Sequence, residues 1–285
     1  MTEKYLISVI IPTHNRVNLL LEAIDSVRNQ TYRNVEIVVI DDKSSDNTEE
    51  VVNDLVKIDS RIKYFKNVRN SGPSATRNIG IDNTKGEFIS FLDDDDVWEP
   101  EKLEKQLKTA LSLECISLIF CNGFCPGTIK KYAWDVSIQN DFIKYKKNEF
   151  PLKVSLPPPS SWFMHKDIIK KTGKFDESLM YWEDQDYVLR IFLNFSVYFL
   201  NELLVKWGEA ENHLYTLSEK LMDAKELFLS KHENLMRKDK DYLFRFYYRL
   251  GKDCKELNKR DRARKYFLKA LKLKPFKLEL LAKIL

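Results

Sequence analysis

The chain has 285 residues, of which 44% are hydrophobic and 12% aromatic, a composition typical of folded proteins that argues against disorder. Its net charge of +4 is unevenly spread: from Leu214 onward there are 20 Lys or Arg against 10 Asp or Glu, and the preceding residues carry 27 against 33. This length allows one large domain, or one domain with a small appendage, and the acidic front and basic tail suggest two parts with different partners.

The apolar segments and cysteines exclude further classes. No stretch approaches the roughly 20 apolar residues of a membrane span. The run Val9–Ile11 is too short for a signal peptide and meets Pro12 at once, so we expect a soluble, cytoplasmic protein. Cys121 and Cys125 lack a second Cys or His pair that would complete a zinc site, and all four cysteines are expected to be structural thiols.

The first ninety residues alternate between short apolar runs and amphipathic segments. Strands are expected at 7–11, where Pro12 ends the run, and at 35–40 and 62–65. Helices are expected from Asn18, as N-cap, to about Gln30, from Thr48 onward, and at 74–81. Strand and helix in alternation predict an α/β fold with a mostly parallel sheet covered on both faces.

A fourth strand, 88–92, stops abruptly at four consecutive carboxylates, Asp93 to Asp96. The strand at 35–40 also ends in acid, Asp41-Asp42, and parallel strands place such ends on the same edge, where ligands bind in open α/β sheets. Neighbouring carboxylates repel one another unless a cation intervenes, which favours a divalent metal. An acidic loop before the helix that begins near Pro100 is the alternative, and the stretch alone leaves both open.

Missing motifs narrow the choice of ligand. Only eight glycines are present, and they form neither a dinucleotide-binding G-x-G-x-x-G nor a P-loop. No H-E-x-x-H pair occurs, which argues against a zinc metallopeptidase. A site with clustered Asp but no glycine cradle is expected to handle phosphates through a bound metal such as Mg²⁺.

The middle of the chain, 112–168, is less regular. A strand is expected at 118–120, a rigid extended segment at 156–159, and a helical turn at 167–171 closed by Gly173. Further on, Glu183, Asp184 and Asp186 precede an apolar helix at 188–193. These carboxylates either cap the helix and complement its dipole, or include a partly desolvated general base.

Six motifs, in this order and spacing, resemble the family 2 glycosyltransferases, which are inverting enzymes of the GT-A fold. The likeness covers roughly residues 5 to 215. The motifs are Val9-Ile-Ile-Pro-Thr-His-Asn-Arg16, Val38-Val-Ile-Asp-Asp-Lys-Ser-Ser-Asp-Asn-Thr48, Gly72 with Arg77-Asn78, Gly86-Glu-Phe-Ile-Ser-Phe-Leu-Asp-Asp-Asp-Asp96, Gly173-Lys-Phe-Asp-Glu177 and Trp182-Glu-Asp184.

The resemblance implies a role for each matching residue. Asp95 is the expected metal ligand of the D-x-D element, and Asp184 is the expected catalytic base. His213 sits where some members place a further metal or diphosphate ligand, with a surface histidine as the alternative. Contacts to the nucleotide sugar, usually a UDP-sugar, fall on Thr13, Asn15, Arg16, Asp42, Arg77, Asp93 and Asp94. The acceptor region falls on Ser160, Ser161, Trp162 and Glu183.

The implied reaction is metal-dependent transfer of a sugar to a hydroxyl of a glycan or lipid-linked acceptor, with Mn²⁺ or Mg²⁺ as cofactor. The metal would neutralise the departing diphosphate, and a carboxylate would take the hydroxyl proton. Two alternatives remain: a nucleotidyltransferase acting on sugar phosphates, against which the Glu183-Asp184 element argues, and an inactive scaffold that binds partners through the tail. The scaffold would require loss of Asp95 or Asp184, and both are present.

From about Leu217 the pattern is almost entirely helical, with Gly251 and Pro275 as breakers. The stretches 242–257 and 262–275 resemble one tetratricopeptide-type hairpin, fewer than the three or so repeats that stand alone. We therefore expect a catalytic domain at 1–215 and a basic helical appendage at 216–285. Its positive charge suggests peripheral contact with an anionic membrane, or only a solvated basic face, and no nucleic-acid recognition motif is present.

Overall fold

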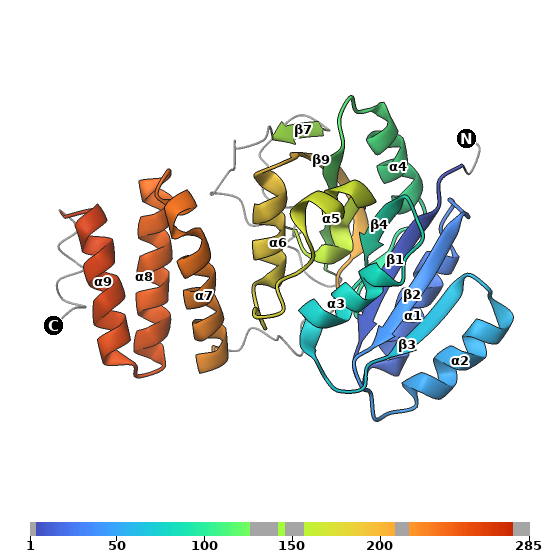
Figure 1. The fold of residues 1–285 in the computed structure, drawn as a ribbon, viewed down its shortest axis with the longest axis horizontal. Coiled ribbons are helices and arrows are strands. Elements are labelled where there is room, and N and C mark those ends of the chain that lie inside the picture. The colour runs from blue at the N-terminus through green and yellow to red at the C-terminus, as the bar shows by residue number, and fades with distance from the viewer. Residues whose placement is uncertain (1–3, 126–141, 146–156, 209–216, 276–285) are drawn as a thin grey trace. The chain divides into compact units, whose positions relative to one another are not determined.

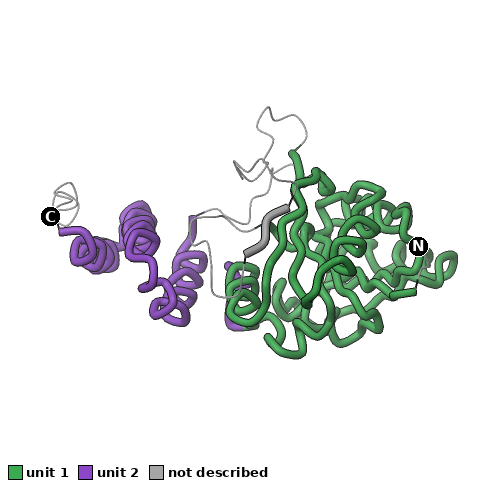
Figure 2. The backbone as a smooth tube through the Cα atoms, turned by 90° about the horizontal axis from the view of Figure 1, so that it is seen from above, with its two compact units in different colours: residues 1–150, 156–177, 184–210 green, residues 151–155, 178–183, 211–285 purple. Residues whose placement is uncertain are grey.

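The computed structural model describes residues 4–125, 142–145, 157–208 and 217–275. The chain divides into two compact units (Figure 2), which we describe separately. The first comprises residues 1–150, 156–177 and 184–210 and holds the sheet, and the second comprises 151–155, 178–183 and 211–285 and holds the C-terminal helices. We call them the sheet unit and the helical unit.

The sheet unit opens with four parallel strands in the order β3-β2-β1-β4 (Figure 1). Both β1 and β2 are buried almost throughout, as their continuous Val and Ile runs require in a sheet covered on both faces. The predicted strands are confirmed, although Pro12 lies inside β1 and does not end it. The strands are β1 (Ile7–Thr13), β2 (Val35–Asp41), β3 (Ile62–Lys66) and β4 (Phe88–Phe91).

Beyond β4 the sheet becomes mixed, and its order continues β8-β6-β9-β5, with β7 also paired to β9. Strand β8 runs antiparallel to both neighbours, so it enters the sheet at the edge where β4 and β6 leave it. The sequence predicted only part of β6 here. The strands are β5 (Val97–Trp98), β6 (Ser117–Phe124), β7 (Phe142–Tyr145), β8 (Trp162–His165) and β9 (Ser196–Lys206).

Helices cover both faces of the sheet, and each face has its own apolar cluster. Side chains of α1, α2 and α4 pack in one cluster, and side chains of α5 and α6, with Ile81 of α3, pack in the other. Alternate residues of β1 enter different clusters, as a strand between two layers must: Val9 and Ile11 face one and Ile10 the other. The helices are α1 (Val17–Arg28), α2 (Thr48–Ile58), α3 (Gly72–Asp82), α4 (Lys102–Ser112), α5 (Lys166–Thr172) and α6 (Glu183–Phe192), with a short 3-10 turn, η1 (Pro159–Ser161).

The start of α1 differs from expectation. The helix begins at Val17, so Asn18 is not its N-cap. Instead the Val17 amide donates to the Asp46 carboxylate at 3.3 Å. The capping oxygen therefore comes from the loop after β2, a partner that local sequence does not reveal.

Lys102, the first residue of α4, is fully buried. Lys102 Nζ donates to Gln106 Oε1 at 2.7 Å and lies 3.8 Å from the centroid of the Trp98 ring. Gln106 Nε2 donates in turn to the Ser161 carbonyl, and Trp98 Nε1 donates to the Ser160 carbonyl. This network ties α4 to the segment that leads into β8.

The helical unit contains α7 (Glu219–Met236), α8 (Lys240–Glu256) and α9 (Arg260–Leu273). Ser218 caps α7, and Asp239 caps α8. Gly251 does not break the pattern as expected: it lies inside α8, where an added Cβ would meet the Phe267 ring at 2.8 Å. Its smallness lets α8 and α9 approach closely. The tetratricopeptide likeness stays a prediction. No helix among the residues that the structure describes is long and apolar enough to cross a membrane.

We expect Lys102→Met to remove a pH-dependent gain in stability. Burial lowers the pKa of Lys102 from 10.5 to about 8, so the unfolded chain binds the extra proton between these values and wild-type stability rises with pH there. The gain amounts to about 3 kcal/mol, at about 1.36 kcal/mol per pH unit. Urea unfolding at about pH 7 and about pH 10 measures it.

Lys105→Met is the matched control, because Lys105 lies on the same helix but pairs with Glu101 and Glu202, which raise its pKa. It should leave the wild-type gain in place. A Lys102→Met protein with the full wild-type gain would contradict the assignment.

Candidate active site

The four carboxylates Asp93 to Asp96 lie just after β4, at the edge where β1 and β2 also end. Thr13, the last residue of β1, donates its hydroxyl to Asp94 at 2.7 Å. The Asp42 amide, just after β2, donates to the Thr13 carbonyl at 2.8 Å. Three strand ends are therefore joined at one point, as parallel strands with acidic ends allow.

Two arginines pair with the acidic run. Arg16, just before α1, donates Nη1 to Asp94 Oδ1 and to Asp95 Oδ2, both at 3.0 Å. Arg77, on α3, donates Nη2 to Asp93 Oδ1 at 2.7 Å, and its guanidinium lies over the Phe175 ring. Asp93, Asp94 and Asp95 therefore each meet a guanidinium from another element.

Arg16 and Arg77 only partly offset the free-energy cost of burying these carboxylates in their charged form. Burial raises the pKa of Asp94 to about 6 against the opposing effects of Thr13 and Arg16. Burial and the charge of Asp93 raise the pKa of Asp95, and the same two causes raise that of Asp96 to about 8. The cluster therefore attracts further positive charge.

The Asp42 carboxylate holds the loop that leads into α3 through three hydrogen bonds. Its Oδ1 accepts from Asn67 Nδ2 and from the Ser71 amide, and its Oδ2 accepts from the Gly72 amide, each at 2.8 Å. Asn15 has a related role at the neighbouring loops, where its Oδ1 accepts from the Ser45 amide at 2.7 Å. Both side chains thus shape the loops beside the acidic run.

The serines and tryptophan predicted for the acceptor region are buried. Ser160 Oγ accepts from the Asp93 amide at 3.0 Å, which attaches η1 directly to the acidic run. Ser161 Oγ donates to the Pro158 carbonyl. Trp162 stacks near Phe175 and donates its indole N–H to the Pro157 carbonyl. Their roles toward an acceptor stay predictions.

Asp184 lies in the first turn of α6, immediately after Glu183, and both are buried. Burial raises the pKa of Asp184, while the Gln185 amide, which donates to Oδ1 at 2.7 Å, and the charge of Arg77 lower it. Arg77 therefore acts on Asp93 and Asp184 together. His213 lies outside the described residues.

The sequence does not predict two contacts at this site. Asn78 holds Phe175 through both backbone groups, with its Oδ1 accepting from the amide and its Nδ2 donating to the carbonyl, each at 2.9 Å. Gly208, just after β9, donates its amide to Asp96 Oδ1 at 3.0 Å. The motif Arg77-Asn78 is a sequence signal for the contact of Asn78 with Phe175. The contact of Gly208 with Asp96 has no signal beyond an isolated glycine.

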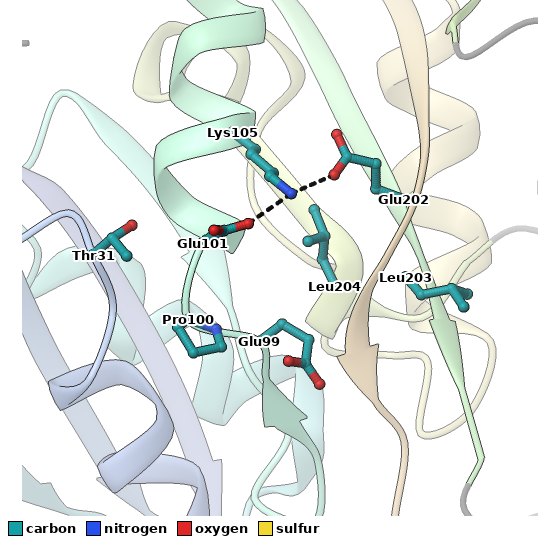
Figure 3. Close-up of a pocket in the computed structure, with 8 residues that line it drawn as sticks. All are labelled: Thr31, Glu99, Pro100, Glu101, Lys105, Glu202, Leu203 and Leu204. Atoms are coloured by element: carbon teal, nitrogen blue, oxygen red, sulfur yellow. Dashed lines mark hydrogen bonds and ion pairs between the residues drawn. The ribbon is translucent and has the colours of Figure 1, made fainter.

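A hollow of about 380 Å³ lies elsewhere on the sheet unit (Figure 3). Lys105 points into it and bonds Glu101 and Glu202, as the dashed lines show. None of its lining residues is a predicted site residue. They are Thr31, Glu99, Pro100, Glu101, Lys105, Glu202, Leu203 and Leu204.

Residues 8–173 match the model of the family described as glycosyl transferase family 2, which is more than half of the chain. The chain belongs to glycosyl transferase family 2. The matched segment holds the strand ends, both arginines and the acidic run, and it ends before Asp184.

Relatives of this family 2 chain extend the likeness. A Campylobacter jejuni protein named GalNAc(5)-diNAcBac-PP-undecaprenol beta-1,3-glucosyltransferase is 32% identical over 277 residues, which cover 89% of this chain and 86% of that protein. An uncharacterized glycosyltransferase of Rickettsia typhi is 35% identical over 206 residues, 70% of this chain and 63% of that one. A further relative, from Rickettsia felis, is matched over only 24% of its length.

Solved structures share the fold. S. aureus TarS aligns with a TM-score of 0.71 at 19% identity, covering 98% of this chain and 50% of TarS. A mannosyltransferase from Pyrobaculum calidifontis, solved with GDP-Man and Mn²⁺, aligns with a TM-score of 0.64 at 14% identity and covers 99% of this chain and 79% of that one. The expected GT-A architecture with added C-terminal helices is thereby confirmed.

We expect Gly208→Ala to destabilise the sheet unit. An added Cβ would lie 2.3 Å from the Asp95 carbonyl oxygen, so one of the two backbones must move. The cost of such overpacking is about 1–3 kcal/mol, measurable by urea unfolding. Lys206→Ala, at an exposed position two residues earlier, is the control and should behave as wild type. Equal stability of both variants would contradict the close approach.

Proposed function

We propose that this protein is an inverting glycosyltransferase that moves a sugar from a nucleotide-diphosphate sugar, with a UDP-sugar favoured, to a hydroxyl of a glycan or lipid-linked acceptor. Family membership supports the reaction class. The name of the Campylobacter jejuni relative describes a glucosyltransferase with an undecaprenol-linked substrate, and TarS has been solved with UDP and with UDP-GlcNAc. The observation that carries the proposal is the meeting of three strand ends at the acidic run, where Arg16 and Arg77 pair with its carboxylates.

The donor would bind along the joined strand ends. We assign the nucleotide to Thr13, Asn15, Arg16, Asp42 and Arg77, and the ribose side to Asp93 or Asp94. Two arginines beside these carboxylates supply the positive charge that a diphosphate requires. Asp42 retains lone pairs beyond its three amide contacts, so its clamp role is compatible with accepting from a base.

A divalent cation, Mn²⁺ or Mg²⁺, suits the chemistry of the acidic run. Its side-chain donors are hard oxygens, burial and mutual repulsion raise their pKa values, and the Asp95 side chain is 41% exposed. Within the described ranges no three His, Cys, Asp or Glu side chains form a metal cage. We assign the ion to Asp95 together with the donor phosphates. When bound, the ion supplies neutralisation of the departing diphosphate.

Asp184 is our candidate for the general base. The acceptor hydroxyl oxygen would attack the anomeric carbon as the bond to the diphosphate oxygen breaks, and its proton would pass to the Asp184 carboxylate. Burial makes this carboxylate more basic than a solvated one, which suits proton removal. Attack opposite the leaving group completes the transfer in one displacement.

Two earlier alternatives gain no support. A nucleotidyltransferase would leave the buried Asp184 without a task, and an inactive scaffold would require the loss of Asp95 or Asp184, both of which are present. Membrane contact through the basic helices stays a prediction. Several of their cations already pair with acids of the same unit, among them Lys225 with Asp253 and Arg262 with Asp223.

We expect Asp95→Asn to weaken Mn²⁺-dependent UDP binding by about tenfold or more, because a neutral amide is a poorer ligand for a hard cation. Titration calorimetry with UDP, with and without Mn²⁺, measures this. Asp54→Asn removes an exposed carboxylate on α2 and serves as the control. Unchanged Mn²⁺-dependent binding in Asp95→Asn would remove the metal assignment.

Asp184→Asn should retain donor binding but lose transfer by about 10²–10⁴-fold, because the amide cannot accept the hydroxyl proton. The donor is first identified by screening nucleotide sugars for metal-dependent hydrolysis, and kcat and donor KM are then compared. Asp186→Asn lies in the same turn and breaks an ion pair with Arg190, so it controls for local damage. Near-wild-type turnover in Asp184→Asn would exclude the residue as base.

A further inference from the structure

The acidic run Asp93 to Asp96 forms a β-turn. The Asp96 amide donates to the Asp93 carbonyl at 3.1 Å, which is the hydrogen bond that closes a four-residue turn. Asp94 and Asp95 are the two central residues of this turn. The conformation of the turn therefore sets the directions of their side chains and, with them, the separation of the two carboxylates.

The hydroxyl of Ser160 joins the two ends of this turn. Its oxygen accepts from the Asp93 amide at 3.0 Å, and its O–H donates to the Asp96 carboxylate. Ser160 follows Asp93 by 67 residues in the chain, so it belongs to a different segment from the turn. A side chain of η1 thus bridges the first and the last residue of the acidic run.

The Ser160 side chain is fully buried, and the one proton of its hydroxyl goes to Asp96. The contact with an acceptor that the family resemblance implies for this residue would need a hydroxyl that reaches solvent. Both hydrogen bonds that Ser160 makes lead instead to the carboxylates that we assign to the donor.

Side chains of β5 and α4 hold the backbone at Ser160. Trp98 Nε1 donates to the Ser160 carbonyl at 2.8 Å, and Gln106 Nε2 donates to the Ser161 carbonyl at 2.9 Å. Lys102 Nζ donates to Gln106 Oε1 at 2.7 Å, which fixes the orientation of this amide. Trp98, Lys102 and Gln106 are all buried. A shift of η1 would leave buried donors unpaired, so the position of Ser160 is well determined.

We propose that Ser160 is a positioning residue for the donor side of the site, because its hydroxyl fixes the turn that sets the spacing of Asp94 and Asp95. Trp98 and Gln106 support it by holding the backbone of η1. This inference rests on the proposed function, which assigns the cation and the donor phosphates to Asp95. It gives Ser160 no contact with the cation or the nucleotide.

The test compares Ser160→Ala, which removes the hydroxyl, with Ser160→Thr, which keeps it. We expect Ser160→Ala to weaken UDP binding in the presence of Mn²⁺ by about tenfold or more, because residues that orient the ligands of a metal contribute on this scale. UDP binding without Mn²⁺ should fall much less, since Thr13 and Asp42 keep their places. Titration calorimetry of the full chain in both conditions measures the difference.

Ser160→Thr should restore most of the Mn²⁺-dependent affinity. A fall of equal size with and without Mn²⁺ in Ser160→Ala would overturn the proposal, because it would indicate general damage to the site.

Ser90→Ala is the matched control. Ser90 is also fully buried, and its hydroxyl donates to the Trp162 carbonyl, in the segment that holds Ser160, without contacting the acidic run. This variant should keep the wild-type Mn²⁺-dependent UDP affinity at temperatures where it is folded, which thermal unfolding establishes. A loss as large as that of Ser160→Ala would overturn the proposal in favour of general destabilisation.

A second variant and a ligand-free measurement extend the test. Trp98→Phe keeps an aromatic ring but removes the N–H that holds the Ser160 carbonyl, so it applies even if Ser160→Ala fails to fold, and it should lower the Mn²⁺-dependent affinity in the same direction. Hydrogen exchange of the amides at 93–96 should be faster in Ser160→Ala and unchanged in Ser90→Ala. Unchanged exchange in Ser160→Ala would overturn the role of the hydroxyl.

Asp95→Asn in the same titration separates the two levels of inference. If its Mn²⁺-dependent UDP binding equals that of wild type, the proposed metal assignment fails, and the hydrogen exchange still decides whether Ser160 fixes the turn. If Asp95→Asn loses this binding while Ser160→Ala keeps it, only the positioning role fails.

Discussion

Electrostatic repulsion among the carboxylates of Asp93 to Asp96 is the constraint on which the packing around this edge of the sheet unit depends. Four adjacent carboxylates at one strand end are unfavourable in isolation, and partial burial increases the cost because it withholds water from them. The structure offsets this with Arg16, just before α1, with Arg77 of α3, and with the amide of Gly208. Each of these groups belongs to a different element. The acidic run therefore also acts as the point to which α1, α3 and the end of β9 are fastened.

The first half of the fold was readable from the sequence because its elements are local. The Val and Ile runs of β1 and β2 and the alternation of strand with helix suffice to specify parallel pairing. The second half was not readable, because β8 is four residues long and its pairing with β4 and β6 depends on tertiary contacts. Strand β9 follows α6 with few turn signals. Gly251 looked like a helix breaker, yet it serves as a packing position.

The candidate site likewise has residues that local sequence predicts and contacts that depend on the tertiary fold. Strand ends and acidic motifs place Asp42 and Asp93 at one edge from pattern alone, whereas Thr13 was assigned to the site through the family resemblance. The pairing of Arg16 with both Asp94 and Asp95 depends on side-chain reach across about eighty residues of sequence, and no spacing rule supplies it. Trp182 was noticed as a neighbour of Asp184. Its aromatic partners, Phe228 and Phe246, come more than forty residues later in the chain, so no local pattern links them to Trp182.

The hydrogen bonds between Asn78 and Phe175 join two segments that are synthesised at different times. A ribosome releases β1 to β4 and α3 early, and these local elements can begin to fold during synthesis. Phe175, which Asn78 holds and over which the Arg77 guanidinium lies, is added about a hundred residues later. The nascent chain thus carries an acidic run whose second arginine lacks its aromatic support. The surface that we assign to the donor is therefore completed only after most of the sheet unit has been translated.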